Sequence, residues 1–225
     1  MMKFDLTEQG IRDLNRFLHS PHSKESVIEV ENPSGSHNVA VGALQHSQVM
    51  VNGHVGYYCA AMNQHAEITV NGNAGPGLAE NMMSGMVHVR GNASQYCGAT
   101  AHGGLLVVEG NASSRCGISL KGMDIIVGGS IGHMSAFMAQ TGRLVVCGDA
   151  AESMGDSIYE ARIYVRGKVA SLGTDCIEKP IEKEHLEELK ELLDRAQFNH
   201  SATEFKRYGS ARRLYNFDVD NARLY

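Results

Sequence analysis

The sequence has 225 residues, of which 20 are Lys or Arg and 25 are Asp or Glu, so its net charge is −5. Without an excess of basic residues, it is not expected to bind nucleic acid. No apolar stretch approaches the roughly 18 residues of a membrane span, and the N-terminal segment lacks a signal-peptide core, so we expect a cytoplasmic protein.

The first part of the chain, residues 1–26, is expected to form an N-terminal cap. Thr7 is the predicted N-cap of an amphipathic helix that ends at Ser20 and Pro21. The apolar face of this helix consists of Ile11, Leu14, Phe17 and Leu18. Residues 27–41 are expected to form an irregular first coil that covers otherwise unpaired strand edges.

A glycine recurs every nineteen residues through the middle of the chain, without an insertion. These repeat glycines are Gly53, Gly72, Gly91, Gly110, Gly129, Gly148 and Gly167. A valine precedes each of them by two residues, and another aliphatic residue precedes it by four. Alternating aliphatic residues followed by a breaker are typical of a short strand with one buried face.

Small side chains occupy the positions three and seven residues after each repeat glycine, which gives the motif G-x-x-small-x-x-x-small. One such unit cannot bury its own apolar face, whereas stacked units cover one another. The sequence therefore predicts a mostly β fold, a right-handed parallel β-helix of about seven coils over residues 27–176, with short α-helices at both ends. Asn73, Asn92 and Asn111 are expected to form a ladder of stacked amides at left-handed corners.

The position three residues before each repeat glycine should point outward from the predicted strand. Its residues are Met50, Thr69, His88, Val107, Ile126, Val145 and Tyr164. The middle of this stripe is apolar, although an outward face is normally polar. We therefore expect a cover, either one of the chain's own terminal helices or another subunit.

The five cysteines are an odd number, which favours free thiols. They are Cys59, Cys97, Cys116, Cys147 and Cys176. Cys97 and Cys116 share a coil position and would lie within disulfide range. A reduced, buried ladder of small apolar side chains is the preferred interpretation.

Charged residues also share coil positions, but none forms a recognisable catalytic set. Asp156 and Asp175 are interpreted as a solvated pair rather than a cation or acid–base site. Asp124, Arg143 and Arg162 predict a surface salt-bridge ladder. The histidines His54, His65, His88, His102 and His133 fall at five different repeat positions. The sequence therefore predicts no catalytic, cofactor-binding or metal-binding residue.

Residues 177–225 differ in composition from the repeats and predict a helix followed by a docking tail. Pro180 is the expected first-turn proline of the helix, which could lie over the end of the solenoid. The tail mixes aromatic and basic residues, a composition typical of partner docking. Its candidate docking residues are Tyr208, Arg212, Arg213, Tyr215 and Phe217. The alternative is a tail that wraps around its own domain.

The glycine repeat after a V-x-V strand, as in VNGNAGPGLAENMMSG and GGSIGHMSAFMAQTG, resembles the C-terminal GXGXG β-helix domain of the glutamate synthase large subunit. The resemblance covers residues 39–176. With its flanking helix and tail, the chain is most similar to the stand-alone β-helix subunit of N-methylglutamate synthase (methylamine–glutamate N-methyltransferase).

This resemblance implies a non-catalytic scaffold in a complex that converts glutamate and methylamine to N-methylglutamate and ammonia. The implied partners are a class II glutamine-amidotransferase-like subunit and an FMN-binding glutamate-synthase-like subunit. FMN and an iron–sulfur cluster are expected in the partner, and no cofactor is expected in this chain.

Other functions remain open on the same pattern. The chain could belong to glutamate synthase itself, or to a complex such as formylmethanofuran dehydrogenase, one chain of which shares the glycine repeat. A stand-alone carbohydrate-active β-helix would need a groove of exposed aromatic side chains and carboxylates, to which only Asp156 and Asp175 point.

Overall fold

The computed structural model describes residues 2–21 and 26–212 of the chain. The strands are β1 (Met2–Asp5), β2 (Ser26–Glu31), β3 (Ser47–Asn52), β4 (Glu67–Val70), β5 (Met86–Val89), β6 (Leu105–Val108), β7 (Lys121–Val127), β8 (Thr141–Val146), β9 (Arg162–Val165), β10 (Cys176–Lys179) and β11 (Lys206–Ser210). The helices are α1 (Gly10–His19), α2 (Lys183–Arg195) and a short 3₁₀ helix, η1 (Ala202–Glu204).

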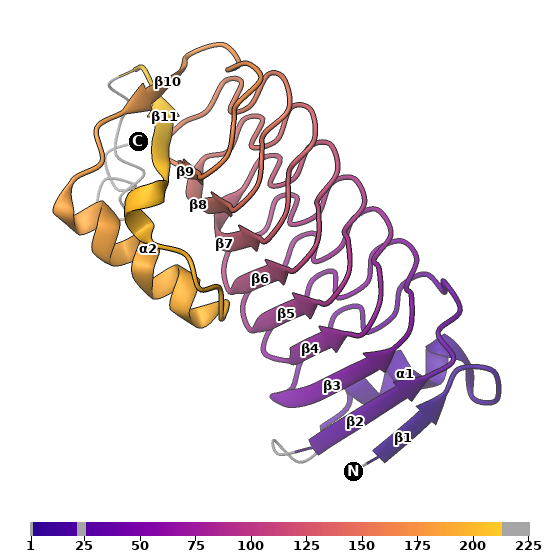
Figure 1. Ribbon diagram of the computed structural model, residues 1–225. Helices are drawn as coiled ribbons and strands as arrows, with labels where there is room; N and C mark the ends of the chain where they lie inside the picture. Colours follow the sequence, from indigo (N-terminus) through magenta and orange to yellow (C-terminus); the bar gives the residue numbers. More distant parts are fainter. Residues whose placement is uncertain (1, 22–25, 213–225) are drawn as a thin grey trace, which may run out of the picture.

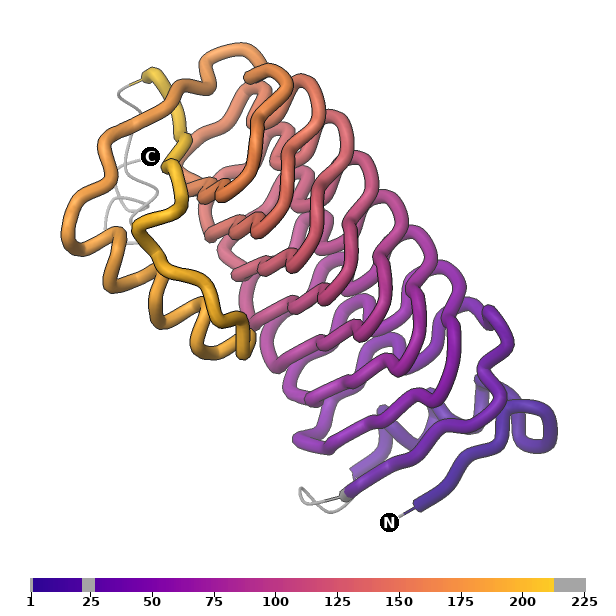
Figure 2. Tube along the Cα trace, viewed as in Figure 1, coloured from indigo at the N-terminus to yellow at the C-terminus, as the bar shows by residue number. Residues whose placement is uncertain are grey.

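The predicted parallel β-helix is confirmed, because strands β3 to β9 stack in register, one per coil (Figures 1 and 2). Val70 lies opposite Val51 and Val89, and Val89 lies opposite Val108. The same alignment continues up to Val165 in β9. A period of nineteen residues therefore becomes a column of identical positions, each covering the one below.

The first coil, predicted over residues 27–41 as irregular, contains a regular strand that joins the stack. Ile28 of β2 lies opposite Val49 of β3, so the first coil is two residues longer than the others rather than irregular. Strand β1 then adds another parallel edge, with Phe4 opposite Val30. Because this coil contains two extra residues, strand β2 does not fit the nineteen-residue period of the later strands.

Helix α1 closes the N-terminal end of the solenoid. Its side chains Leu14 and Leu18 are fully buried in the main core, which is the cluster of apolar side chains inside the solenoid. The helix begins at Gly10 rather than after Thr7, whose hydroxyl donates to Asp5 Oδ1 instead (2.6 Å). Ser20 ends it, as predicted.

Close approach between coils explains the repeat glycines. The N–H of Gly91 donates to Gly72 O (3.1 Å), and that of Gly110 donates to Gly91 O (3.0 Å). A Cβ on Gly110 would lie 2.8 Å from Gly91 O and would also collide with Asn92 Oδ1. Neither Gly91 nor Gly110 has a left-handed φ. Here glycine is needed for space between coils and not for its backbone freedom.

The predicted asparagine ladder is present, but its bonds differ from those expected. Asn73 Oδ1 accepts the N–H of Asn92, and Asn92 Oδ1 accepts the N–H of Asn111, both at 2.8 Å. The contact between the amides of Asn73 and Asn92 is longer, at 3.3 Å. These asparagines do not have left-handed φ angles. The side chains therefore act mainly as acceptors for the backbone of the next coil.

Left-handed residues occur instead in the arm segments, which we define as 57–62, 76–81, 95–100, 114–119, 133–138 and 152–157. In the first of these, Tyr58, Ala60 and Met62 have φ angles of 60°, 56° and 56°. The arm segments lie across the interior from the sheet, since a Cβ on Gly98 would meet the side chain of Ile125.

The C-terminal end is closed by strands rather than by the predicted helix. Strand β11 pairs antiparallel with β9, and β10 pairs antiparallel with β11 (Figure 1). Tyr208 of β11 is 5% exposed and belongs to the main core. Helix α2 lies along the side of the solenoid, and it begins at Lys183, three residues after Pro180.

Candidate functional site

Helix α2 covers the apolar outward stripe of the sheet. The cluster beneath it joins Leu189, Leu192 and Leu193 of α2 to sheet residues that include Val107 and Val145. The predicted cover is therefore the chain's own C-terminal helix. Outside the helix the stripe becomes more exposed, because Met50 of β3 is 38% exposed.

A network of charged side chains holds α2 against the sheet. Arg143 donates two hydrogen bonds to Asp124, each 2.6 Å long. Glu188 of α2 accepts from Arg162 (2.7 Å), from Arg143 (3.2 Å) and from the Tyr164 hydroxyl (2.6 Å). Burial and the neighbouring Glu188 raise the pKa of Tyr164 well above its usual range, so this hydroxyl remains a donor. The predicted ladder of Asp124, Arg143 and Arg162 thus serves to attach the helix.

The outward surface of the arm segments, which we call the arm face, is bare within the described residues. Several of its large apolar side chains are exposed, including Tyr57 (50%), Met62 (49%) and Met138 (41%). Tyr58 is also exposed, and Phe137 is half-buried. Exposed aromatic and methionine side chains on one face are typical of protein-binding surfaces.

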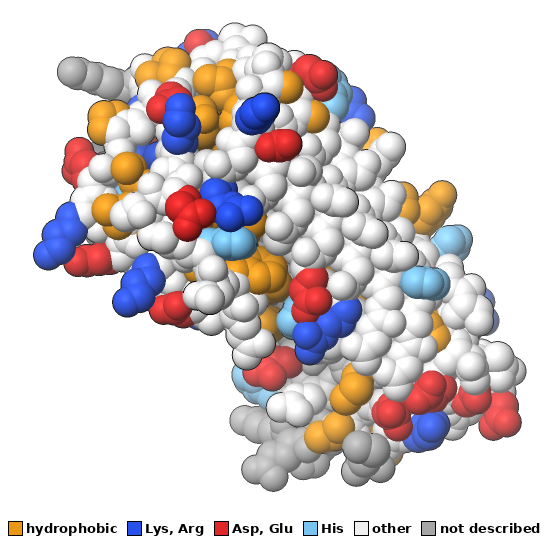
Figure 3. All heavy atoms as spheres, in the orientation of Figure 1, with side chains coloured by type: hydrophobic (Ala, Val, Ile, Leu, Met, Phe, Trp, Pro, Cys, Tyr) orange, Lys and Arg blue, Asp and Glu red, His pale blue; other side chains and the backbone are white. Residues whose placement is uncertain are grey.

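The arm face is also poor in charge. From residue 57 to residue 138, its arm segments contain only two residues that are charged at neutral pH, Glu80 and Arg115. Arg115 stacks over the Tyr96 ring, 5.8 Å from the centroid, and Nη1 lies 3.4 Å from the Tyr96 hydroxyl. Burial raises the pKa of Glu80. By contrast, acidic and basic side chains lie side by side on α2 (Figure 3).

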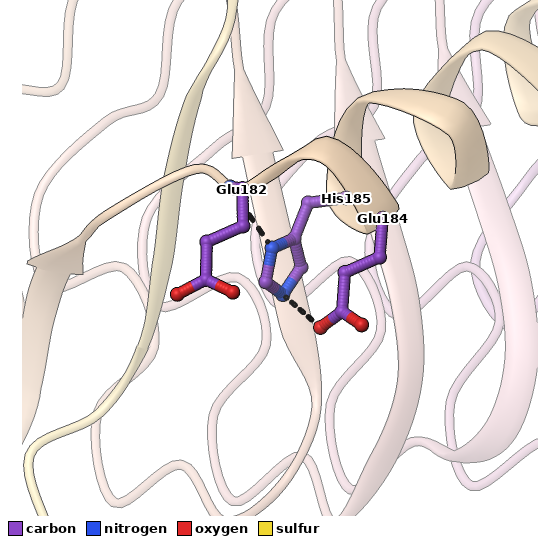
Figure 4. A group of neighbouring side chains, drawn as sticks. All are labelled: Glu182, Glu184 and His185. Atoms are coloured by element: carbon purple, nitrogen blue, oxygen red, sulfur yellow. Dashed lines mark hydrogen bonds and ion pairs between the residues drawn. The ribbon is translucent and has the colours of Figure 1, made fainter.

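One group of potential metal ligands, Glu182, Glu184 and His185, lies at the start of α2 (Figure 4). The side chains of Glu182 and His185 form a capping box with the backbone of the helix start, in which His185 Nδ1 accepts the N–H of Glu182 (3.1 Å). His185 Nε2 lies 2.6 Å from the guanidinium of Arg207, which can only donate. The lone pair of Nδ1 is used by the helix start, and the Arg207 guanidinium places a positive charge against Nε2, where it would repel a metal cation, so this group caps the helix.

The cysteines are buried and free, which confirms the preferred interpretation. Burial raises the pKa of Cys59 to about 12. A hydrogen bond with Cys97, together with burial, raises the pKa of Cys116 well above its usual range. Protonated thiols of this kind are poor nucleophiles and poor metal ligands.

The remaining candidates do not converge on one site. Asp156 accepts from the Ser157 hydroxyl (2.8 Å), whereas Asp175 forms an ion pair with Arg212 (2.5 Å). Two histidines one repeat apart, His46 and His65, stack on each other, a pair that was not predicted from the sequence. The rings of His46 and His65 are 4.7 Å apart and nearly parallel.

The predicted docking tail is only partly described. Tyr208 lies in the chain's own core and is not available on the surface, which corrects its assignment as a docking residue. Arg212 is exposed and pairs with Asp175. Arg213, Tyr215 and Phe217 lie outside the described residues. Over residues 206–210, the alternative interpretation of a tail that wraps its own domain is the one observed.

Neither α-helix in the described part of the chain is long and apolar enough to cross a membrane.

These features define a class of protein: a parallel β-helix with a packed interior, one side covered by its own helix and the other side covered by none of the described residues. The sequence is 59% identical over 228 residues to Protein GlxC of Rhizobium meliloti (strain 1021), and the match covers 100% of both chains. The chain therefore belongs to the GlxC family. No family model matches the sequence.

Proposed function

We propose that the chain is a non-catalytic scaffold subunit of a glutamate-synthase-like complex. It bridges a class II glutamine-amidotransferase-like subunit and an FMN-binding synthase-like subunit, which holds the FMN and the iron–sulfur cluster. The observation that carries this proposal is the arm face, a charge-poor surface with exposed Tyr57, Met62 and Met138 that no described part of the chain covers.

This surface contrasts with the interior of the solenoid. The interior is filled by ladders of Val, Ile, Ala and Cys side chains, so it offers no channel for a substrate. Protein interfaces are depleted of charge at their centre and enriched in Tyr, Phe and Met. A rigid stack with such a surface is suited to holding other subunits in a fixed arrangement.

The glycine repeat supports the choice of complex, since it resembles the β-helix of glutamate synthase. Within that class, N-methylglutamate synthesis from glutamate and methylamine is the reaction we favour. The tail residues Arg213, Tyr215 and Phe217 remain proposed contributors to docking.

Purification of the native complex with arm-face variants tests the proposal. Met62→Glu combined with Met138→Glu places charge at two exposed positions of the arm face. We expect this variant to lose its partner subunits, whereas Met50→Glu, at an exposed position on the sheet side, keeps them. Equal recovery of the partners with both variants would contradict docking on the arm face.

Cofactor analysis tests the choice of complex separately. The native complex should contain FMN and iron, and the isolated chain should bind neither. Stoichiometric flavin in the isolated chain would overturn the scaffold assignment, and a native complex without flavin would overturn the glutamate-synthase-like assignment.

A further inference from the structure

A small hollow lies at the C-terminal end of the solenoid, between the loop before β9 and the antiparallel pair β10 and β11. Its volume is about 160 Å³. The side chains that matter for its chemistry are those of Arg162, Lys179, Arg207 and Arg212, together with Glu160. Four cations therefore line a space that one carboxylate shares.

Two of the cations face each other across a strand pair. Lys179 of β10 lies directly opposite Arg207 of β11 in the antiparallel register. Like charges placed directly opposite destabilise a sheet. The stem of Lys179 passes over Gly209, with its Cδ 3.5 Å from the place that a Cβ on that glycine would take. The register therefore places the two cationic side chains on the same face of the strand pair.

The same two cations have no carboxylate partner among the described residues. Arg207 donates to Pro180 O (3.0 Å) and lies 2.6 Å from His185 Nε2, and neither of these groups is an anion. Burial, Arg207 and Arg162 lower the pKa of His185, whereas Glu184 and Glu182 oppose this shift. No ion pair of Lys179 occurs within the described part of the chain, where its strand neighbour Glu178 pairs with Lys206.

The other two arginines are already neutralised. Arg162 pairs with Glu188 (2.7 Å), a carboxylate that Arg143 also contacts. Arg212 pairs with Asp175. Among the described residues, positive charge without a carboxylate partner is therefore concentrated on Lys179 and Arg207.

We propose that this hollow binds a small oxyanion, a carboxylate or phosphate group, between Lys179 and Arg207. A guanidinium presents paired N–H donors that match either group, and an ammonium adds a point charge. The volume suits one such group, because sites for larger ligands are typically about 300 Å³ or more. None of the residues that line the hollow belongs to an arm segment, and the proposal does not depend on the proposed scaffold function.

Calorimetric titration of the full-length protein with sodium phosphate, and separately with sodium acetate, tests the proposal at constant ionic strength. We expect at least one of the anions to bind. The variant Lys179→Met, which keeps the apolar stem, should weaken binding roughly tenfold, the effect of losing one charge-assisted contact of about 1.4 kcal/mol. Lys190→Met, at an exposed position of α2, is the control and should bind normally.

Thermal unfolding gives a second readout that a structural role for Lys179 would not produce. Without added anion, Lys179→Met should raise the Tm, because it relieves the repulsion with Arg207. Phosphate or acetate should then raise the Tm of the wild type more than that of the variant. Absence of binding by both anions, or equal binding by Lys179→Met and the wild type, would overturn the proposal.

A peptide of acidic residues distinguishes the source of the anion. If the free ions bind and the peptide does not compete with them, the ligand is a free small ion. If the peptide displaces them, the same oxyanion site accepts a protein side chain. Both results support an oxyanion site between Lys179 and Arg207.

Discussion

The two sides of each coil are built from the same repeat but have opposite surfaces. On the sheet side, α2 buries Val107 and Val145, and Glu188 attaches the helix through Arg162 and Tyr164. On the arm side, no described segment covers the exposed tyrosines and methionines, and few charges accompany them. The difference teaches that one repeat can support a face closed by the chain's own helix and an opposite face that no described residue covers.

The largest expected effect is a difference in stability between a variant beneath α2 and a variant on the arm face. Val145→Asp places a carboxylate under α2, where water is excluded, and should lower the free energy of unfolding by roughly 4 kcal/mol or more. Met138→Asp on the arm face should change it by no more than about 0.5 kcal/mol. Urea unfolding of both variants measures the contrast, and similar losses would show that the arm face is also covered.

Substitution of a repeat glycine tests the close packing between coils, on which both faces depend. Gly110→Val should cost roughly 3 kcal/mol, because the new side chain would press on Gly91 O and Asn92 Oδ1 in the coil below. Gln95→Val, at an exposed arm position, is the control and should be nearly neutral. Wild-type stability of Gly110→Val in urea would contradict the close packing between coils.

The attachment of α2 is expected to make a smaller contribution. Glu188→Gln weakens the acceptor that Arg162 and Tyr164 share, and should cost roughly 1–2 kcal/mol. Glu187→Gln, one residue earlier and exposed, should have almost no effect on the urea midpoint. If the two variants were equally stable, the apolar contacts alone would hold the helix.

The smallest effect is a labelling rate that separates undocking of α2 from unfolding of the solenoid. Cys147 lies in the cluster beneath α2, and burial raises its pKa to about 11. Its thiol should react slowly with a disulfide reagent at pH 8, because the docked helix keeps it buried and protonated. Cys97, inside the main core, should react only on global unfolding. Mass spectrometry of labelled peptides distinguishes the sites, and equal rates at both cysteines would show that the helix and solenoid open together.

The stacking of coils could be predicted because each repeat carries the same local signals. Val70, Val89 and Val108 are spaced identically, so the constant period alone predicts that their strands stack. The first coil was not predicted as a regular one because two inserted residues shift Ile28 out of that period. Strand β1 was not predicted because its four residues carry little local signal.

The position of α2 and the role of the tail could not be predicted from the sequence. The apolar stripe required a cover, but periodicity does not specify which segment supplies it. Tyr208 lies in a short strand whose partner β9 is far away in sequence, and its aromatic and basic neighbours suggested a surface. The left-handed arm segments were missed as well, since Tyr58 and Met62 are not residues that normally indicate such a backbone.

The ladder of asparagines at the corner of the coils gives the solenoid a constant spacing between coils. Because each Asn side chain bonds to the backbone one repeat later, neighbouring coils are fixed at the spacing of adjacent strands, about 4.8 Å. Insertion or deletion of one whole repeat would therefore move whatever is bound above it by about 4.8 Å while leaving both sides of the remaining coils unaltered. In such a molecule the distance between two attached proteins is encoded simply as a number of repeats.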